Sequence, residues 1–456
     1  MKQVWVLLFL GSTFLTFGQI RLASHPLELK KAKEYHQIIN TSDRQNDNVF
    51  VFATDKEKTT ILKYSPFLFF KDSMVTKRPD VGYKLMAGYS FGPDENPTLY
   101  WTDSNFRNIV AVHYDLVAKT TTANYLQLPL QRETVLNAFN ENNNFYVLTK
   151  KNTAEALVLY VFKGGEKTQY LLDFSGFEFV NSKKEAISLS MILSVLPLEK
   201  IETRAYNPLF KATSKSKFYV RENDILFTFD HNFNETQLFQ LDFKTLKLVE
   251  RSIPQFPLKR LNGLSNSYYH ENKIYQVTAN DEELHFGYKD FQTDAVTKEF
   301  SVTKNDTITF KNSPLFAQVM NQRPKAMKTT AKFLKQLSGT DLGVTVYKTP
   351  KNLFLTIGGN QEIEQLSTGF ASNGGDFVTN SYFIPLNVYF ESVLDKKGNH
   401  INSKPEPLAA DFIGQFSFEN PQAVLQSTFR HKNYYINGYY DTKLKQFVMQ
   451  KFYDGF

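Results

Sequence analysis

The chain has 456 residues, with 53 Lys and Arg against 46 Asp and Glu, and no cysteine. The missing thiols exclude disulfides, thiolate zinc sites, iron–sulfur ligation and a cysteine nucleophile. A hydrophobic content of 42% with 22% charged residues excludes a wholly disordered chain, and the length fits two or three domains or one large all-β domain.

The net charge of +7 raises the question of nucleic-acid binding. Arginine supplies only 11 of the 53 basic residues, and the lysines are dispersed along the chain. Proteins that read nucleic acids rely on arginine, because its planar guanidinium binds phosphates and bases through two hydrogen bonds. The composition therefore favours a solvated basic surface, and we expect no nucleic-acid partner.

Residues 1–18 have the pattern of a secretory signal peptide. Lys2 precedes the apolar run Val4–Leu10, and the small residues Thr16 and Gly18 fit a cleavage site. The run is shorter than the ~20 residues that cross a bilayer, and no later segment is long and apolar enough. We expect an exported protein of the periplasm or the medium, with residues 19–456 as the mature domain and no transmembrane segment after cleavage. A large exported chain without cysteine is typical of bacterial envelopes.

After a short amphipathic stretch expected to be helical (Leu27–Gln37), the chain reads mostly as strands joined by short turns. Alternating and apolar runs bounded by turn residues predict strand groups in five regions: 98–126, 145–172, 224–251, 273–302 and 434–452.

An aspartate recurs at the exit of one strand in four of these groups: Asp115, Asp242, Asp290 and Asp441. Its carboxylate can accept the backbone N–H groups of the following turn. Asp242 and Asp290 are 48 residues apart, and the 151 residues from Asp290 to Asp441 amount to about three such steps. A period of roughly 40–50 residues with three or four strands per unit is typical of β-propeller blades.

Three insertions, near residues 182–206, 325–339 and 398–415, interrupt this period. In the first, Ser182–Glu185 has the spacing of a capping box before Ala186–Leu196, a run that also alternates like a strand; we favour a helix. The second contains a predicted helix over Lys325–Leu337, and the third a short helix over Pro405–Gln415.

The predicted fold is therefore all-β: a single β-propeller of about seven blades, with six or eight as alternatives, and two or three short helical insertions. Closure requires the terminal strands to pair, because an open sheet leaves unpaired edges. We expect the C-terminal strand Gln446–Phe452 to pair with a strand near Tyr35–Asn40.

Two segments, Lys217–Phe243 and Lys273–Val277, carry a resemblance to uncharacterised exported β-propeller proteins of bacterial envelopes. The resemblance covers essentially the whole mature length. The chain has no Trp-Asp repeat, and its double glycines do not recur at one blade position. The resemblance therefore implies a fold and no catalytic residues.

Motifs that carry chemistry are scarce. The histidines do not pair at helical metal-site spacing, and there is no nucleophile elbow, phosphate loop or dinucleotide fingerprint. Ser90 and Ser367 lie near glycines without a nucleophile pattern. We therefore predict no catalytic residue, no metal site and no cofactor, and leave the ligand-binding residues unknown. The histidines are His25, His36, His113, His231, His270, His285, His400 and His431.

Three acidic clusters lack the alternating oxygen ligands of a calcium loop: Asp94–Glu95, Asp281–Glu283 and Gly374–Asp376. We read Asp281–Glu283 as a solvated hairpin tip. Outside the signal segment Trp101 is the remaining tryptophan, which weakens a sugar-stacking hypothesis. Three tyrosine pairs alternate across strand faces, so one ring of each is expected in the core; they are Tyr268-Tyr269, Tyr434-Tyr435 and Tyr439-Tyr440.

The functional hypothesis is a non-catalytic binding or scaffolding propeller of the cell envelope or the secreted fraction. Loops gathered at one rim of a rigid scaffold would hold a protein, peptide or glycan. The alternative is a hydrolase or lyase acting on envelope or environmental polymers. That alternative requires acidic, His or Tyr side chains from several blades to converge.

Overall fold

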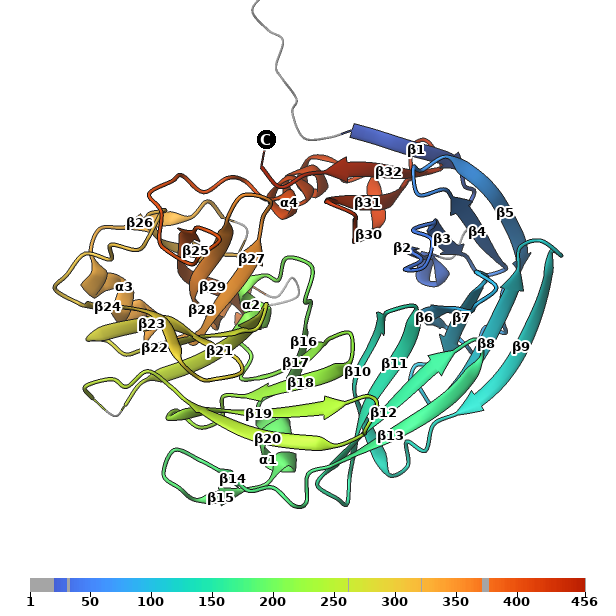
Figure 1. Cartoon of the computed structure of the whole chain (residues 1–456). Coiled ribbons are helices and arrows are strands. Elements are labelled where there is room, and N and C mark those ends of the chain that lie inside the picture. The colour runs from blue at the N-terminus through green and yellow to red at the C-terminus, as the bar shows by residue number, and fades with distance from the viewer. Residues whose placement is uncertain (1–19, 31–32, 261, 321, 371–376, 456) are drawn as a thin grey trace, which may run out of the picture. The chain divides into compact units, whose positions relative to one another are not determined.

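The structure is a computed structural model that describes residues 20–30, 33–260, 262–320, 322–370 and 377–455; its side-chain description also leaves out residues 363–384. The predicted signal peptide, residues 1–18, lies outside the described residues. The chain divides into two compact units, one formed by Met1–Met86, Tyr114–Thr121 and Glu406–Phe456, the other by Ala87–His113 and Thr122–Pro405. Across the described residues, seven sheets of four or five strands make up an all-β propeller with seven blades (Figure 1). The predicted fold is confirmed.

The first unit contains two blades. Blade 1 is a four-stranded antiparallel sheet in chain order, and blade 7 combines three strands from the end of the chain with one from its beginning. The strands are β2 (Gln37–Ser42), β3 (Val49–Thr54), β4 (Lys58–Tyr64) and β5 (Phe70–Lys77) in blade 1, and β30 (Ala423–His431), β31 (Tyr434–Asp441), β32 (Gln446–Phe452) and β1 (Ile20–Pro26) in blade 7.

Strand β1 completes blade 7 by pairing antiparallel to β32, with Ile20 opposite Lys451 and Pro26 opposite Gln446 (Figure 1). The expected partner near Tyr35–Asn40 was wrong, because that segment forms β2, the first strand of blade 1. The expected helix over Leu27–Gln37 is reduced to a single 3-10 turn, Lys33–Tyr35.

The second unit holds blades 3 to 6 and most of blade 2. Blades 2, 3 and 5 are antiparallel sheets in chain order. Their strands are β6 (Leu85–Phe91), β7 (Pro97–Thr102), β8 (Asn108–Asp115) and β9 (Thr120–Gln127); β10 (Glu133–Glu141), β11 (Asn144–Lys151), β12 (Ala156–Lys163) and β13 (Glu166–Asp173); and β21 (Leu264–His270), β22 (Lys273–Ala279), β23 (Glu283–Asp290) and β24 (Val296–Thr303).

Blade 4 has an additional strand, because β16 (Leu198–Ile201) pairs parallel to the antiparallel set that follows it. A two-stranded hairpin, β14 (Phe179–Val180) and β15 (Ala186–Ile187), precedes this blade. The antiparallel set is β17 (Ser216–Val220), β18 (Asp224–Phe229), β19 (Glu235–Asp242) and β20 (Leu248–Pro254).

Blade 6 departs from chain order. The strand order in its sheet is β26 (Lys325–Met327), β25 (Leu315–Val319), β29 (Phe377–Leu394), β28 (Leu353–Phe370), β27 (Asp341–Lys348). Strands β25 and β26, at one edge of the sheet, therefore precede the other three in sequence. Strand β27 pairs with β28 only from Leu353 to Asn360, whereas the β28–β29 register continues to Phe370 opposite Phe377. The two long strands therefore extend beyond the blade as a two-stranded ribbon.

The burial of each strand explains whether its sequence is apolar or polar. Every residue of β18 is buried, because an inner strand of a blade is covered on both faces of its sheet. In contrast, nearly every residue of β9, the outermost strand of its blade, is exposed. Apolar runs mark strands covered on both faces, and polar runs mark strands at the periphery.

The helical insertions are present with shifted boundaries. Helix α1 (Leu189–Val195) is capped at its N-terminus by Ser188, whose hydroxyl accepts a hydrogen bond from Met191 N. The predicted capping box, Ser182–Glu185, lies before the helix. Helix α3 (Thr330–Leu337) begins after Thr329, whose side chain accepts from Lys332 N, so the predicted first turn belongs to β26 instead. The other helices are α2 (Leu209–Ala212) and α4 (Ala409–Glu419), and no helix among the described residues is long and apolar enough to span a membrane.

The turn aspartates act as predicted. The Oδ1 atoms of Asp115, Asp242 and Asp290 each accept backbone N–H groups two and three residues ahead, at the end of the third strand of a blade. Asp441 makes the same contacts but ends the second strand of blade 7. The three-step spacing from Asp290 to Asp441 therefore does not mark equivalent positions.

Candidate functional site

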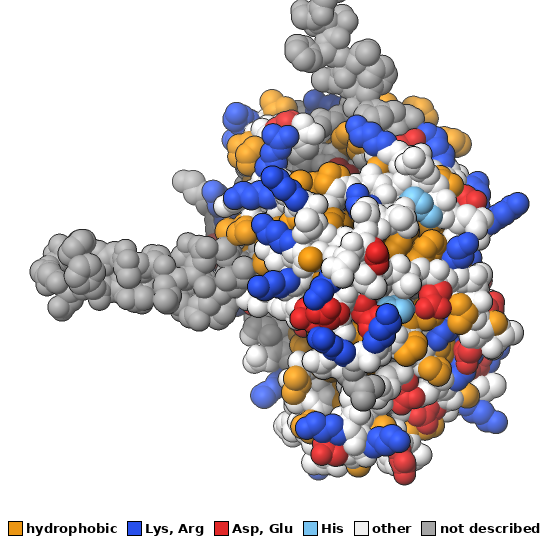
Figure 2. Space-filling model, turned by 90° about the vertical axis from the view of Figure 1, so that its left-hand side faces the viewer, with side chains coloured by type: hydrophobic (Ala, Val, Ile, Leu, Met, Phe, Trp, Pro, Cys, Tyr) orange, Lys and Arg blue, Asp and Glu red, His pale blue; other side chains and the backbone are white. Residues whose placement is uncertain are grey.

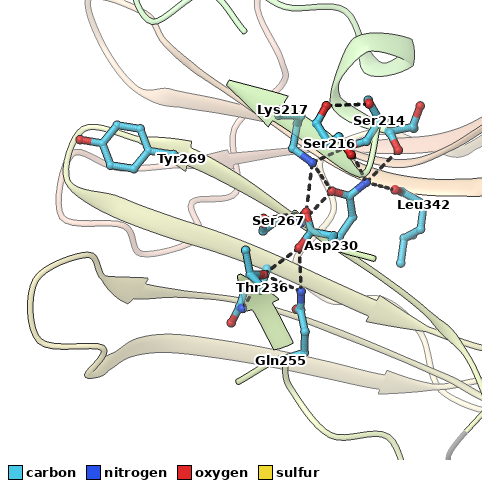
Figure 3. Close-up of polar contacts among 12 residues, drawn as sticks. Ser214, Ser216, Lys217, Asp230, Thr236, Gln255, Ser267, Tyr269 and Leu342 are labelled. Atoms are coloured by element: carbon cyan, nitrogen blue, oxygen red, sulfur yellow. Dashed lines mark hydrogen bonds and ion pairs between the residues drawn. The ribbon is translucent and has the colours of Figure 1, made fainter. Parts of the chain in front are cut away.

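A buried polar network links blades 4 and 5 (Figure 3). The Lys217 ammonium lies 3.1 Å from Asp230 Oδ2 and donates to Asn266 Oδ1 at 2.5 Å, and the Lys217 and Asp230 side chains are both fully buried. Asp230 Oδ2 also accepts from Ser267 N and Oγ. Its Oδ1 accepts from Thr236 Oγ1 at 2.7 Å.

The chain positions these groups through blade order. Lys217 lies on β17, Asp230 directly follows β18, and Asn266 lies on β21 of the next blade. Asn266 Nδ2 donates to Leu342 O at 2.6 Å, which extends the network to blade 6. Burial lowers the pKa of Lys217, and the charge of Asp230 acts in the opposite direction. Because neither charge is exposed to solvent, the network is a structural link between blades 4 and 5, here called the buried clasp.

A second charged group lies where the first strands of blades 3 and 4 meet. Lys200 Nζ is 3.2 Å from Glu141 Oε2 and 2.6 Å from Glu202 Oε1. Two carboxylates from different blades thus meet on one ammonium, which lies over the Phe139 ring. One ammonium thus pairs with both carboxylates, which leaves the group with a net charge of −1, and the contact joins the first strands of the two blades.

In the first unit, exposed aromatic rings gather on the segment that follows β4 and ends at the first residue of β5, Pro66–Phe70, here called the aromatic loop. Ser65 holds it: the Ser65 hydroxyl accepts from Phe67 N and Phe69 N at 3.3 and 3.1 Å. Ser65 N donates to Phe69 O, and Leu68 N donates to Ser65 O, both at 2.8 Å. Four hydrogen bonds within five residues fix the backbone of this loop.

Leu68 sets the direction of the neighbouring rings. Its φ of 66° lies in the left-handed region that favours glycine, at a cost of about 1–3 kcal/mol for a non-glycine residue. Leu68 is buried in the core cluster of blades 1 and 7, whereas Phe67 and Phe69 are 75% and 73% exposed. The loop therefore places one side chain in the core and projects the two phenylalanines on either side of it into solvent.

Strands of blade 7 support the aromatic loop. His431 Nε2 lies 3.1 Å from Pro66 O, and Lys432 Nζ lies 4.8 Å from the centroid of the Phe67 ring. His25 of β1 stacks on Phe70 at a centroid distance of 5.0 Å. The loop is thus held by two neighbouring blades as well as by its own turn.

The charges beside the aromatic loop are mostly basic. Lys71 follows it directly, Lys432 lies over Phe67, and both are exposed. Burial lowers the pKa of His431, Lys432 and Lys451 lower it further, and the Pro66 carbonyl and Asp47 raise it. Burial also lowers the pKa of His25. Both histidines are therefore neutral at pH 7, and lysines carry the positive charge next to the exposed rings.

The turn between β8 and β9 carries another exposed apolar residue of the first unit. Val117 is 91% exposed. Lys119 in the same turn lies 2.7 Å from Asp72 of β5, two residues beyond Phe70. This ion pair ties the turn to the strand that begins at the aromatic loop.

The sequence-predicted residues are mostly structural. His113 Nδ1 lies 3.2 Å from Thr98 Oγ1 and its Nε2 3.2 Å from Asp94. His285 contacts Glu283 and Glu299. Both histidines lie within strands, as expected, and among the described residues no group of three or more His, Asp or Glu could hold a metal ion.

The acidic and serine positions also have structural partners. Glu283 is buried and accepts from Lys259 N, so the solvated-tip interpretation was wrong for this residue, which opens β23. Glu282 pairs with Lys304 at 2.7 Å. Ser90 is buried and bonded to the Tyr100 hydroxyl. Ser367 has no side-chain description, and Gly374–Asp376 lies outside the described residues.

The aromatic candidates for sugar stacking are buried. Trp101 is fully buried, and both rings of the pairs Tyr434-Tyr435 and Tyr439-Tyr440 are at most 9% exposed. One ring of each pair was expected in the core; in these two pairs both rings are buried, because sheets that are covered on both faces bury both sides of a strand.

Basic and acidic side chains are interspersed on the face that carries β24, β26 and α3 (Figure 2). The charge on this face is mixed, which agrees with the dispersed lysines of the sequence.

No protein-family model and no curated protein sequence matches the chain. Solved structures match over most of its length. The uncharacterized protein lmo1340 from Listeria monocytogenes shares 11% identity over 93% of this chain and 97% of that one, with a TM-score of 0.28. The WD40 domain of SCAP from fission yeast shares 7% identity over 96% and 97%, with a TM-score of 0.34. An oligogalacturonate lyase in complex with manganese shares 8% identity over 96% and 98%, with a TM-score of 0.35. These TM-scores are too low to indicate a shared function, and the strand order of the sheets itself identifies the fold.

Sequence reasoning missed the aromatic loop. The run Pro66-Phe67-Leu68-Phe69-Phe70 contains five apolar residues in a row, which favours a buried segment. The signal that could have identified it is Ser65-Pro66, a turn initiator placed directly before that run.

Proposed function

We propose that this chain is a non-catalytic binding propeller of the cell envelope or the secreted fraction, and that the aromatic loop belongs to its contact surface. The observation that carries the proposal is the exposure of Phe67 and Phe69 on a backbone held by hydrogen bonds and by the buried Leu68. Exposed apolar groups with polar surroundings commonly mark interaction sites. A rigid loop loses little conformational entropy when it binds.

The proposed location follows from the sequence of residues 1–18, whose charged start, short apolar run and small residues are typical of an export signal. The partner classes remain those of the sequence hypothesis: a protein, a peptide or a glycan at the rim. The buried charges of Lys217, Asp230 and Lys200 hold blades together and so lend no support to the enzymatic alternative.

The test compares immobilised wild-type chain with two variants in envelope and culture-medium extracts. Phe67→Ser with Phe69→Ser removes the exposed rings. Phe418→Ser removes a ring that is 87% exposed on α4 and serves as the matched control. We expect one retained partner with the wild type and with Phe418→Ser, and its loss with the double variant.

Equal retention by all three proteins would contradict the proposed role of the loop. A parallel screen of polysaccharide and peptide hydrolysis tests the enzymatic alternative. Reproducible turnover that is abolished by substituting one carboxylate would overturn the non-catalytic proposal.

A further inference from the structure

The aromatic loop combines two features that together indicate a class of partner. Phe67 and Phe69 are three-quarters exposed, so their rings stand out from the surface and do not line a hollow. Projecting rings require either a partner with matching cavities or a deformable apolar phase. The boundary between headgroups and acyl chains of a bilayer is such a phase, and aromatic side chains concentrate there.

The second feature is charge. The loop Pro66–Phe70 contains no charged residue, and Lys63 and Lys71 flank it in sequence. Lys432 reaches it in space, since its ammonium lies over the Phe67 ring and 3.4 Å from Pro66 O. Of the nearby acidic groups, Asp72 is paired with Lys119, whereas Asp47, near the neutral His431, keeps its charge and is outnumbered by Lys71 and Lys432. Cations at the base of an apolar tip complement an anionic surface.

We propose that the aromatic loop docks the propeller on the surface of an anionic phospholipid bilayer, with Phe67 and Phe69 inserted at the headgroup boundary and Lys71 and Lys432 against the phosphates. This inference rests on the proposed binding role of the same loop and adds a lipid surface to the partner classes named there. Lipid binding of this kind strengthens with apolar area and weakens with added salt.

The experiment is flotation of the purified chain with vesicles of phosphatidylcholine alone and of a phosphatidylcholine–phosphatidylglycerol mixture, over a range of salt concentrations. We expect the wild type to float with the mixed vesicles and not with phosphatidylcholine alone. Phe67→Ser with Phe69→Ser should lower the bound fraction about tenfold, because two rings no longer leave water. Lys71→Gln with Lys432→Gln should lower it several-fold and flatten its salt dependence.

Phe418→Ser is the control and should float like the wild type. Thermal melting of each variant separates a binding defect from misfolding. A wild-type chain that stays unbound with both vesicle types, or a Phe67→Ser/Phe69→Ser variant that floats as well as the wild type, would overturn the proposal.

Sedimentation of the same proteins without lipid distinguishes this inference from the broader binding role. If the wild type forms a dimer that the double phenylalanine variant dissociates, the loop binds a second copy; the lipid proposal then fails while the binding role stands. If the double variant loses neither lipid, partner nor self-association, both fail.

Discussion

Lys217 and Asp230 form an ion pair whose members are both fully buried, so each depends on the other and on its hydrogen bonds. Asp230 retains four donors without the lysine, but it would remain a charge inside the protein. We expect Lys217→Met to lower the free energy of unfolding by about 3–5 kcal/mol, the usual cost of an uncompensated buried charge.

Urea unfolding monitored by fluorescence measures this change. Adding Asp230→Asn to Lys217→Met should recover part of the loss, because it removes the remaining charge. Lys332→Met, at an exposed position of α3, is the control and should change the free energy by less than about 0.5 kcal/mol. A Lys217→Met variant as stable as this control would show that the clasp contributes nothing.

His270, at the end of β21, links stability to pH. Burial lowers its pKa from 6.5 to about 4; Glu271 opposes this shift, and Lys348 and Lys273 add to it. Its Nε2 is buried without a hydrogen-bond partner among the described residues. Because the folded-state pKa lies below the unfolded one, the unfolded chain takes up the proton first as the pH falls.

The stability contributed by neutral His270 is therefore present above pH 6.5 and is lost as the pH falls toward about 4. His270→Gln should reduce the dependence of the unfolding free energy on pH across this window by at most about 3 kcal/mol. Urea titrations of both proteins at several pH values measure the slope. Identical slopes would mean that His270 titrates normally in the folded state.

At the scale of elements, the ribbon of β28 and β29 is separable from blade 6. Strand β27 pairs with β28 only as far as Asn360, and β25 pairs with β29 only from Leu386 to Tyr389. Replacing Glu362–Pro385 by an Asn-Gly turn should therefore move the melting temperature by less than about 2 °C.

Phe390→Ala is the matched change inside the blade. Phe390 lies on the same strand β29 and is fully buried, so its truncation should cost about 3–5 kcal/mol. Scanning calorimetry of both variants makes the comparison. A ribbon deletion that destabilises as much as Phe390→Ala would show that the extension supports the blade.

Helices, strands and turns could be predicted from the sequence where the interactions that form them join residues close together in the chain. The turn aspartates were identified because a carboxylate and the N–H groups it accepts lie within three residues. The start of α3 was missed by a few residues because Lys325–Met327 pairs with β25, a contact that helical periodicity does not reveal. The inverted order of blade 6 has the same origin, since pairing between β25 and β29 joins residues about seventy positions apart.

The candidate site was less predictable than the fold. A run such as Phe67-Leu68-Phe69 has the composition of a buried strand, and its exposure depends on the φ of Leu68 and on the Ser65 hydroxyl. The buried clasp was hidden for a different reason: Lys217, Asp230 and Asn266 are separated in sequence and meet only because successive blades stack. Patterns in a single sequence show the local conformational preference of a segment; they do not show which distant residues the fold brings together.

At the scale of the whole molecule, blade 7 joins the two ends of the chain. Strand β32 is hydrogen-bonded to β31 on one side and to β1 on the other, and β1 contributes six paired residues from Ile20 to Pro26. The core cluster of this unit combines Leu27 and Val51 from early in the chain with Ile436 and Met449 from its end. Loss of β32 therefore opens the shared core and leaves β1 unpaired, whereas loss of β1 exposes one edge of β32.

Deleting residues 20–26 removes the outer strand of blade 7, and deleting residues 445–456 removes β32, which is paired on both sides. We expect the second deletion to abolish the cooperative melting transition, because β1 loses its partner, one edge of β31 is exposed, and the buried Phe447 and Met449 are removed. The first deletion should leave a cooperative transition at a lower temperature, because β1 is mostly exposed or half-buried. Calorimetry of both deletions tests this order, and the ribbon deletion, which removes more residues than either, is the control. A chain that melts unchanged without residues 445–456 would contradict closure through blade 7.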